Sequence, residues 1–303
     1  MEDHYAVNIG YRDETIIGNS IASGYTGSNI PYTTMWHYPY ILYRVDLSKT
    51  TTTEKSSDGS IIMTTKEYSY NDKNHQVSQI EEKSNMSDQI RRTEIIYSAD
   101  MTDNASKWMV AKAHRLNDVV ENKTILKENG KEQCMNTQHT SYGSHHVNGS
   151  DYYLPDSLST SIGDAILEIR AWYSYDDSLN VRSVKVDGTE IVYIWSYNSQ
   201  YPIAKIEGLA YDDVVSAIGQ PTISHLLCKA EPTAADFNLI RNAVKQKGGY
   251  ATTYTYKPLV GITSETLPNG NTIHYNYDAF GRLKDAKDND RRIMQSHEYN
   301  YIK

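Results

Sequence analysis

The feature that most restricts the fold of this chain is a regular alternation between β-prone runs and turn-forming residues. Asp58-Gly59, Asn129-Gly130 and Asp187-Gly188 each lie between two runs of polar, β-forming residues. Such a dipeptide is a strong hairpin signal, because both of its central residues tolerate positive φ. Hairpins that follow one another with short loops pair segments that are close in sequence. The pattern therefore predicts a mainly β protein built as an antiparallel meander.

Tyrosine dominates the aromatic residues, with 26 Tyr against 2 Phe and 4 Trp. A tyrosine ring packs on a pleated surface while its hydroxyl stays in water, so tyrosine suits half-exposed strands. This bias favours a thin sheet with two accessible faces over a thick apolar core.

The predicted elements divide the 303 residues into four segments. Residues 1–45 are expected to be mostly irregular, with a candidate strand at 40–45, and residues 46–210 to be degenerate β-hairpin repeats. A helical insertion is expected at 211–249, followed by a β-repeat at 250–303. The predicted strands are 47–55, 61–70, 76–83, 90–97, 119–127, 132–142, 169–175, 181–186, 190–197, 201–207, 251–256, 261–266, 272–277, 282–287 and 292–301.

The helical insertion has both a start signal and an apolar stripe. Thr233 is a candidate N-cap with Asp236 at the third helical position. Phe237, Ile240 and Val244 recur at three and four residues, which places them on one face of a helix. We interpret this stripe as core packing in preference to a groove for a partner.

A tyrosine motif recurs along the chain. Tyr173-Ser-Tyr-Asp176 and Tyr275-Asn-Tyr-Asp278 share the pattern Tyr-x-Tyr-Asp, Tyr68-Ser-Tyr-Asn71 is a degenerate copy, and Tyr299 begins a further one. The period-two alternation of a strand puts both rings on the same face. The Asp or Asn that follows accepts backbone N–H bonds and opens a turn. In the best copy, Tyr275, Tyr277 and Asp278 are followed by Gly281, which supplies positive φ, and by Arg282, which begins the return strand.

This pattern resembles the tyrosine-aspartate (YD) repeat of the Rhs family, best over residues 268–284, and residues 166–303 resemble Rhs-like surface proteins of Bacteroidetes. The resemblance implies an extended β-sheet that curls into a spiral or shell. Larger members enclose a C-terminal toxin or present an adhesive surface. This chain shows no associated core motif, autocleavage site or toxin domain. It is therefore expected to be a non-catalytic scaffold, part of a larger array, located at the cell surface or secreted; its first residues do not form a signal peptide.

Other chemistry finds little support. A net charge of −8 argues against nucleic-acid binding, and no apolar run reaches the roughly 18–20 residues that span a bilayer. His145 and His146 are adjacent, so a strand would point them to opposite faces. Cys134 and Cys228 match no catalytic or zinc signature, and free thiols are favoured over a bridge. We expect no cofactor, no metal and no enzymatic activity.

Two kinds of partner stay open. The aromatic side chains on two nearby strands are candidates for stacking on sugar rings, although cross-strand packing is the favoured interpretation; they are Trp172, Tyr173, Tyr175, Tyr193, Trp195 and Tyr197. The segment from Tyr299 to Lys303 begins a Tyr-x-Tyr strand, and an edge strand offers unpaired backbone groups. We therefore expect further repeats of the same array, or self-association, at this C-terminal edge.

Overall fold

The computed structural model describes residues 2–10, 22–25, 31–34, 42–56 and 59–299, and the side chains from Arg44 onward within these ranges. The chain divides into two compact units. Unit 1 comprises residues 1–100, 116–137 and 162–164, and unit 2 comprises residues 101–115, 138–161 and 165–303. The four-segment division made from the sequence stays a prediction.

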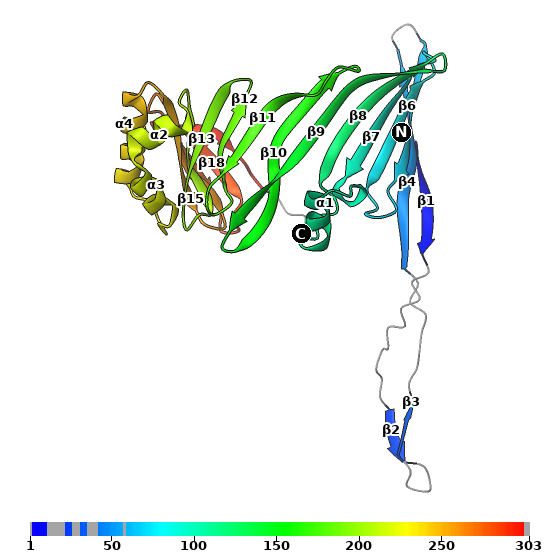
Figure 1. Ribbon diagram of the computed structural model, residues 1–303, viewed down its shortest axis with the longest axis horizontal. Helices are drawn as coiled ribbons and strands as arrows, with labels where there is room; N and C mark the ends of the chain where they lie inside the picture. The colour runs from blue at the N-terminus through cyan, green and yellow to red at the C-terminus, as the bar shows by residue number, and fades with distance from the viewer. Residues whose placement is uncertain (1, 11–21, 26–30, 35–41, 57–58, 300–303) are drawn as a thin grey trace. The chain divides into compact units, whose positions relative to one another are not determined.

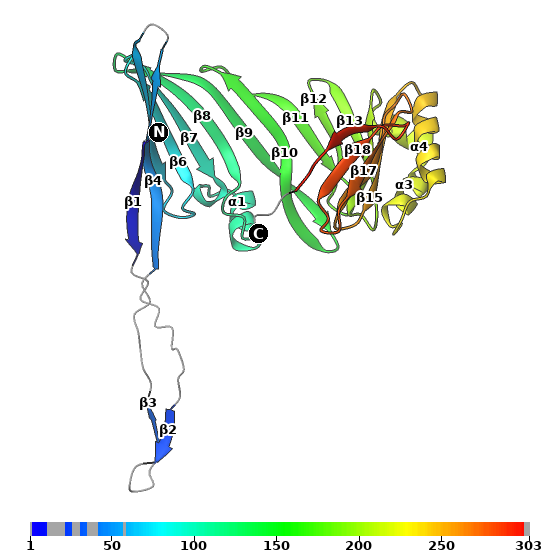
Figure 2. The same ribbon diagram turned by 180° about the vertical axis from the view of Figure 1, so that it is seen from behind.

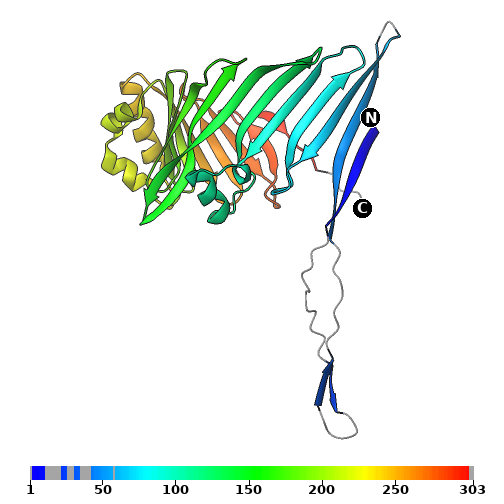
Figure 3. The same ribbon diagram turned by 45° about the vertical axis from the view of Figure 1, so that its right-hand side comes forward.

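Unit 1 is an antiparallel meander in which strands that are consecutive from β4 onward pair with each other (Figure 3). Its strands are β1 (Glu2–Gly10), β4 (Leu42–Lys55), β5 (Ile61–Tyr70), β6 (Val77–Ser84), β7 (Ile90–Tyr97) and β8 (Val119–Glu128), with the start of β9 (Lys131–Val147) and a separate pair, β2 (Ala22–Tyr25) and β3 (Pro31–Thr34). Asn129 and Gly130 have φ of 51° and 75° and join β8 to β9, as the Asn-Gly signal predicts.

Unit 2 is also built as an antiparallel meander. Its sheet contains the second half of β9, then β10 (Ser150–Ile162), β11 (Glu168–Tyr175), β12 (Val181–Val186), β13 (Thr189–Ser196), β14 (Tyr201–Glu207), β15 (Tyr250–Lys257), β16 (Gly261–Thr266), β17 (Thr272–Tyr277), β18 (Leu283–Lys287) and β19 (Ile293–Ser296). From β10 to β19 each strand pairs antiparallel with the next. The predicted mainly β, antiparallel meander is confirmed.

Three helices follow β14 and cover one face of the sheet in unit 2 (Figure 1). They are α2 (Tyr211–Ile218), α3 (Gln220–Leu227) and α4 (Ala234–Gln246). Seen from behind, α3 and α4 flank the strands that include β15 (Figure 2). The helical insertion was predicted from the sequence, and its apolar stripe is core: Phe237, Ile240 and Val244 are all buried. They pack with sheet residues that include Val192, Ile203 and Ile206.

The expected helix start is also present. The backbone N–H of Thr233 donates to the Asp236 carboxylate at 2.6 Å, and the Lys229 ammonium donates to it at 2.6 Å. Burial disfavours the ionised carboxylate, but these hydrogen bonds outweigh it and lower the pKa of Asp236 from 3.8 to about 2. This carboxylate therefore joins the start of α4 to the loop after α3.

Several elements differ from the sequence expectation. Residues 1–45 were expected to be mostly irregular, yet β1 pairs with β4 from Glu2 to Gly10; residues 11–21, 26–30 and 35–41 lie outside the described residues. Strand pairing is a non-local interaction that the weak alternation of this segment does not reveal. Strand β10 was missed although Asn148-Gly149, with φ of 50° and 78°, forms its hairpin turn.

One helix was not predicted either. Helix α1 (Asn104–Ala111) begins at Asp103, whose carboxylate accepts from the Ser106 backbone N–H at 3.0 Å. Eight residues are too few to show a clear period, and helices this short depend on tertiary packing. The packing is supplied by Trp108, whose ring lies 5.9 Å and 5.7 Å from those of Tyr152 and Tyr153.

Candidate functional site

A hydrogen bond from an aromatic side chain to the backbone of the preceding strand recurs along the sheet. We call this contact the aromatic latch: a residue at or near the end of one strand donates to a carbonyl oxygen of the strand before it. The donor and acceptor pairs are Tyr70 and Leu47, Tyr97 and Val77, Tyr175 and Pro155, Trp195 and Val181, Tyr256 and Pro202, Tyr277 and Ile262, and Tyr299 and Leu283, at 2.6 to 2.9 Å.

Each latch residue within a strand coincides with a β-bulge toward the next strand. The register shifts at Tyr70, Tyr97, Tyr175, Trp195, Tyr256 and Tyr277. A bulge places two residues of one strand opposite one of its neighbour and re-aims the side chains there. The latch and the bulge are therefore two parts of one repeating unit.

In unit 2 the latches connect to one another through the sheet. Val181 is the register partner of Tyr175, and its carbonyl accepts from Trp195. Pro202 is in turn the partner of Trp195 and accepts from Tyr256. Ile262 is the register partner of Tyr256 and accepts from Tyr277. Leu283 is the register partner of Tyr277 and accepts from Tyr299. Each repeat is thus anchored on the backbone of the one before it.

The aspartate of the motif organises the turn that follows. Asp278 Oδ1 accepts from the backbone N–H groups of Phe280 and Arg282 at 2.9 and 3.0 Å. Arg282 Nε donates to Asp278 Oδ2 at 2.7 Å, and this hydrogen bond lowers the pKa of the Asp278 carboxyl. Gly281 takes φ of 76°, which glycine adopts at little cost. Asp278, Gly281 and Arg282 thus form one turn, and the return strand β18 begins at Leu283, one residue later than the expected start at Arg282.

The same turn appears at two other aspartates. Asp176 accepts from the backbone N–H groups of Ser178 and Asn180, both at 2.9 Å. Asp288 accepts from those of Asp290 and Arg292 at 2.9 and 2.8 Å. Asp288 lacks a preceding Tyr-x-Tyr, so the sequence motif identified only the first of these two turns as a repeat.

The six aromatic residues considered for sugar stacking do not form one platform. Tyr175 and Trp195 are latch donors, and burial raises the pKa of Tyr175 to about 12. Tyr197 is buried, with its ring 5.6 Å and 5.8 Å from those of Tyr201 and Tyr256. Tyr173 and Tyr193 are half-buried, whereas Trp172 is 48% exposed. Packing within the sheet thus accounts for Tyr175, Trp195 and Tyr197, three of the six residues.

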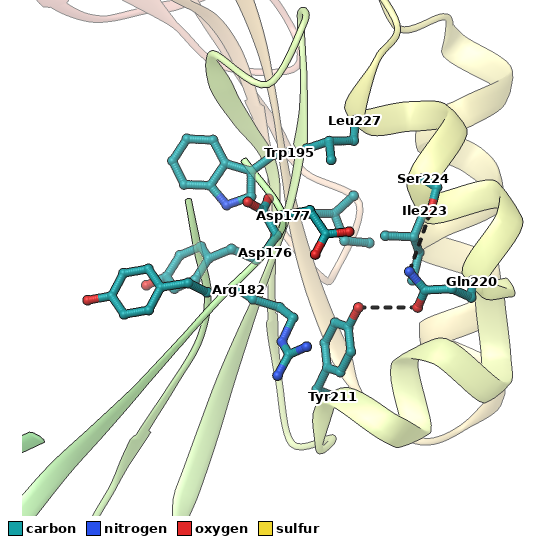
Figure 4. Close-up of a pocket in the computed structure, with 12 residues that line it drawn as sticks. Asp176, Asp177, Arg182, Trp195, Tyr211, Gln220, Ile223, Ser224 and Leu227 are labelled. Carbon is teal, nitrogen blue, oxygen red and sulfur yellow. Dashed lines mark hydrogen bonds between the residues drawn. The ribbon is translucent and has the colours of Figure 1, made fainter. Parts of the chain in front are cut away.

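Two neighbouring cavities lie where the helical insertion of unit 2 meets β11–β13. The first, of about 100 Å³, lies beside α3 (Figure 4) and includes Tyr175, Tyr193 and Trp195 in its wall. The second, of about 280 Å³, contains Trp172 and Tyr173; we call it the Trp172 groove. Its remaining lining residues are Ser174, Arg182, Ser183, Lys185, Glu190, Ala210, Tyr211 and Asp212.

Arg182 and Tyr211 line both cavities. The guanidinium carbon of Arg182 lies 4.3 Å from the centre of the Tyr211 ring, and Figure 4 shows the two side chains against each other. The Tyr211 hydroxyl donates to Gln220 Oε1 at 3.3 Å, and Gln220 Nε2 donates to Ser224 at 3.4 Å. Sequence reasoning missed Arg182, because nothing in its local sequence relates it to Tyr211.

Within the described ranges no three His, Cys, Asp or Glu side chains gather as a metal site would require. Cys134 and Cys228 are free thiols. None of the helices in the part of the chain that the structure describes has both the length and the hydropathy needed to cross a bilayer.

Comparison with known proteins gives a family match and distant structural similarity. No curated protein matches the chain. A crystal structure of TcdB2-TccC3 without its hypervariable C-terminal region is similar over 82% of this chain and 12% of that chain, at 9% identity and a TM-score of 0.35. A crystal structure of TcdB2-TccC3-TEV is similar over 98% and 18%, at 11% identity and a TM-score of 0.33. The chain spans less than a fifth of the length of either, and scores this low do not establish a common fold.

The family match falls on the clearest copy of the motif. The model described as RHS Repeat matches residues 261–293, the region that holds the Tyr277 latch and the Asp278 turn. The match identifies residues 261–293 as an RHS repeat within this chain.

Proposed function

We propose that this chain is a non-catalytic β-repeat scaffold. The observation that carries the proposal is the aromatic latch, which recurs at seven places along the described chain. A contact that joins each repeat to the previous one serves the continuity of the sheet, and it does not gather reactive groups at one place. In repeat proteins stability comes from such nearest-neighbour terms.

The setting we propose is the cell surface or the secreted fraction, as part of a larger repeat array. The RHS repeat at 261–293 supports an array. The described C-terminal strand supports association at that edge, because Ile293 and Met294 of β19 are 63% and 61% exposed. Further repeats or a second copy of the chain would cover these apolar side chains.

The scaffold proposal is tested by breaking one latch and following its neighbours. In Tyr256→Phe the Pro202 carbonyl loses its donor, so hydrogen exchange of the amides in β14 and β16 should accelerate together. Tyr250→Phe is the matched control, since Tyr250 is exposed on the same strand. Faster exchange confined to residue 256, with its neighbours unchanged, would contradict a scaffold of coupled repeats.

A second candidate function is carbohydrate binding at the Trp172 groove. It is favoured by the exposure of the Trp172 indole beside polar side chains that include Lys185 and Glu190. An exposed aromatic face among such groups suits the apolar face and hydroxyl rim of a sugar ring. Binding of the chain to a glycan on an array, lost in Trp172→Ala and kept in Tyr250→Ala, would support this function. If the intact chain binds no glycan on the array, the result argues against it.

A further inference from the structure

The turn between β15 and β16 carries a leucine where its backbone favours glycine. The Val260 N–H donates to the Lys257 carbonyl at 3.0 Å, which closes a β-turn with Pro258 and Leu259 as its central residues. Proline fixes φ at about −65°, whereas Leu259 has a φ of 64°. The turn is therefore type II, and its second central residue is usually glycine or asparagine. A leucine at that position strains the backbone.

Packing does not offset this strain, because Leu259 is 97% exposed. Its backbone is nevertheless held in place. The Leu259 N–H donates to the Tyr201 hydroxyl at 3.1 Å, and the Tyr201 ring stacks on that of Tyr256 at 4.8 Å. A single exposed leucine is common on protein surfaces. One that is strained and fixed in water is an exception of the kind that concentrates at functional sites.

A second apolar side chain lies at the same edge of the sheet in unit 2. Phe280, in the turn between β17 and β18, is 79% exposed. Every second turn of an antiparallel meander lies at the same edge, so these two turns are neighbours. A Cβ at Gly281 would lie 4.0 Å from Val260 Cγ1, which shows that the turns are in contact. We call the side chains of Leu259 and Phe280 the apolar tips.

The two turns are basic, although the whole chain has a net charge of −8. Residues 257–261 and 278–284 contain three cations, Lys257, Arg282 and Lys284, against the single anion Asp278. Arg282 donates to the Asp278 carboxylate, whereas Lys257 and Lys284 are exposed. Apolar side chains flanked by lysines suit an anionic lipid surface, which attracts the ammonium groups and dissolves the apolar ones.

We propose that the apolar tips insert into the surface of an anionic lipid bilayer. Leu259 and Phe280 enter the boundary between headgroups and acyl chains, while Lys257 and Lys284 lie among the lipid phosphates. A side chain that is exposed on nearly every side is covered best by a fluid that surrounds it, whereas a protein partner would need a matching pocket. The inference is independent of the scaffold proposal and gives the scaffold a surface to which it attaches.

The test is co-sedimentation of the full chain with vesicles of phosphatidylcholine, with and without phosphatidylserine, at increasing lipid concentration. Phosphatidylserine should tighten binding at least about tenfold through the two lysines. Leu259→Asn and Phe280→Ser should each weaken binding about tenfold, because each removes an apolar side chain from the bilayer. Since asparagine tolerates positive φ, Leu259→Asn should also unfold at a higher urea concentration. Loss of both binding and stability in Leu259→Asn would assign Leu259 a structural role and overturn the proposal.

Ile166→Ser is the matched control, because Ile166 is 88% exposed in the turn between β10 and β11, at the opposite edge of the sheet in unit 2. This variant should bind vesicles like the intact chain, and circular dichroism shows that each variant has folded. Equal losses in Ile166→Ser and Leu259→Asn would mean non-specific adsorption and overturn the proposal.

Two further outcomes would also overturn it. One is that the folded, intact chain binds neither kind of vesicle. The other is a dimer in light scattering of the lipid-free chain that Leu259→Asn converts to a monomer, since the apolar tips would then contact a second copy. Neither outcome affects the scaffold proposal, which is tested at the Tyr256 latch.

Discussion

The indole N–H of Trp195 donates to the backbone carbonyl of Val181 at 2.8 Å. In the other latches of the described chain the donor is a tyrosine hydroxyl. Indole and phenol both join a large apolar ring to a single polar donor. The repeat therefore requires a ring with a donor at its far end, and tyrosine is the usual but not the necessary residue.

This requirement predicts different outcomes for two changes at one position. Trp195→Tyr should keep most of the stability, because a hydroxyl replaces the indole donor. Trp195→Phe should lose about 0.5–1.5 kcal/mol more, the usual net value of one hydrogen bond. Urea unfolding of both variants measures the difference. Equal stability of the two would mean that ring packing alone holds β13 in place.

Glycine at position 261 should be needed to leave room for a latch. A Cβ at Gly261 would lie 2.5 Å from the Tyr277 hydroxyl oxygen, the donor to the Ile262 carbonyl. Gly261→Ala should thus displace this hydroxyl and destabilise the chain. In the Tyr277→Phe background the hydroxyl is already absent, so the same alanine should cost less. If the stability changes of Gly261→Ala and Tyr277→Phe simply add in the double variant, the two positions are not coupled and the prediction is wrong.

Acid should weaken the contact between α4 and the loop after α3. The pKa of Asp236 is lowered to about 2 from 3.8 by hydrogen bonds that outweigh burial. A depressed carboxyl pKa stabilises the fold fully above the unfolded value, and this contribution is lost as pH falls from about 4 to about 2. Asp236→Asn should flatten that part of the stability profile in chemical denaturation. If the free energy of unfolding of Asp236→Asn falls with pH as steeply as that of the intact chain, other carboxyls cause the loss of stability in acid.

High pH should destabilise the fold at a tyrosine latch, as low pH does at Asp236. Burial raises the pKa of Tyr256 from 10.0 to about 12, so its neutral form is favoured in the folded chain. The stabilisation is complete below pH 10 and is lost as pH rises through about 12. Tyr256→Phe should be less stable at neutral pH but lose less on going from pH 10 to 12. Spectroscopic titration of the intact chain should show a tyrosine that ionises well above the exposed ones, and its absence would contradict this.

The C-terminal edge should affect the oligomeric state. Removal of residues 292–303 takes away the exposed Ile293 and Met294 of β19, together with the Tyr299 latch on Leu283. Light scattering should then show a smaller species than for the intact chain. A monomeric intact chain with a well-protected β19 in hydrogen exchange would rule out association at this edge.

Local chemistry in the sequence determined most of the meander and the insertion. Asn129-Gly130 and Asp187-Gly188 predicted hairpins because few dipeptides take positive φ twice, and Phe237, Ile240 and Val244 predicted a buried helix face by their spacing. Asp278, Gly281 and Arg282 predicted their turn, because its hydrogen bonds all lie within five residues.

The tertiary structure decided which aromatic residue does what. Tyr175, Trp195 and Tyr197 lie in similar sequence, yet their roles differ. Tyr175 donates to Pro155 and Trp195 donates to Val181, whereas Tyr197 packs in the core. The bulge at each latch shifts the alternation by one residue, so the period-two rule does not extend across it. The contact between Arg182 and Tyr211, 29 residues apart in sequence, and the pairing of β1 with β4 depend on how distant segments meet. Such relations are set by the whole sheet and leave no mark in local sequence.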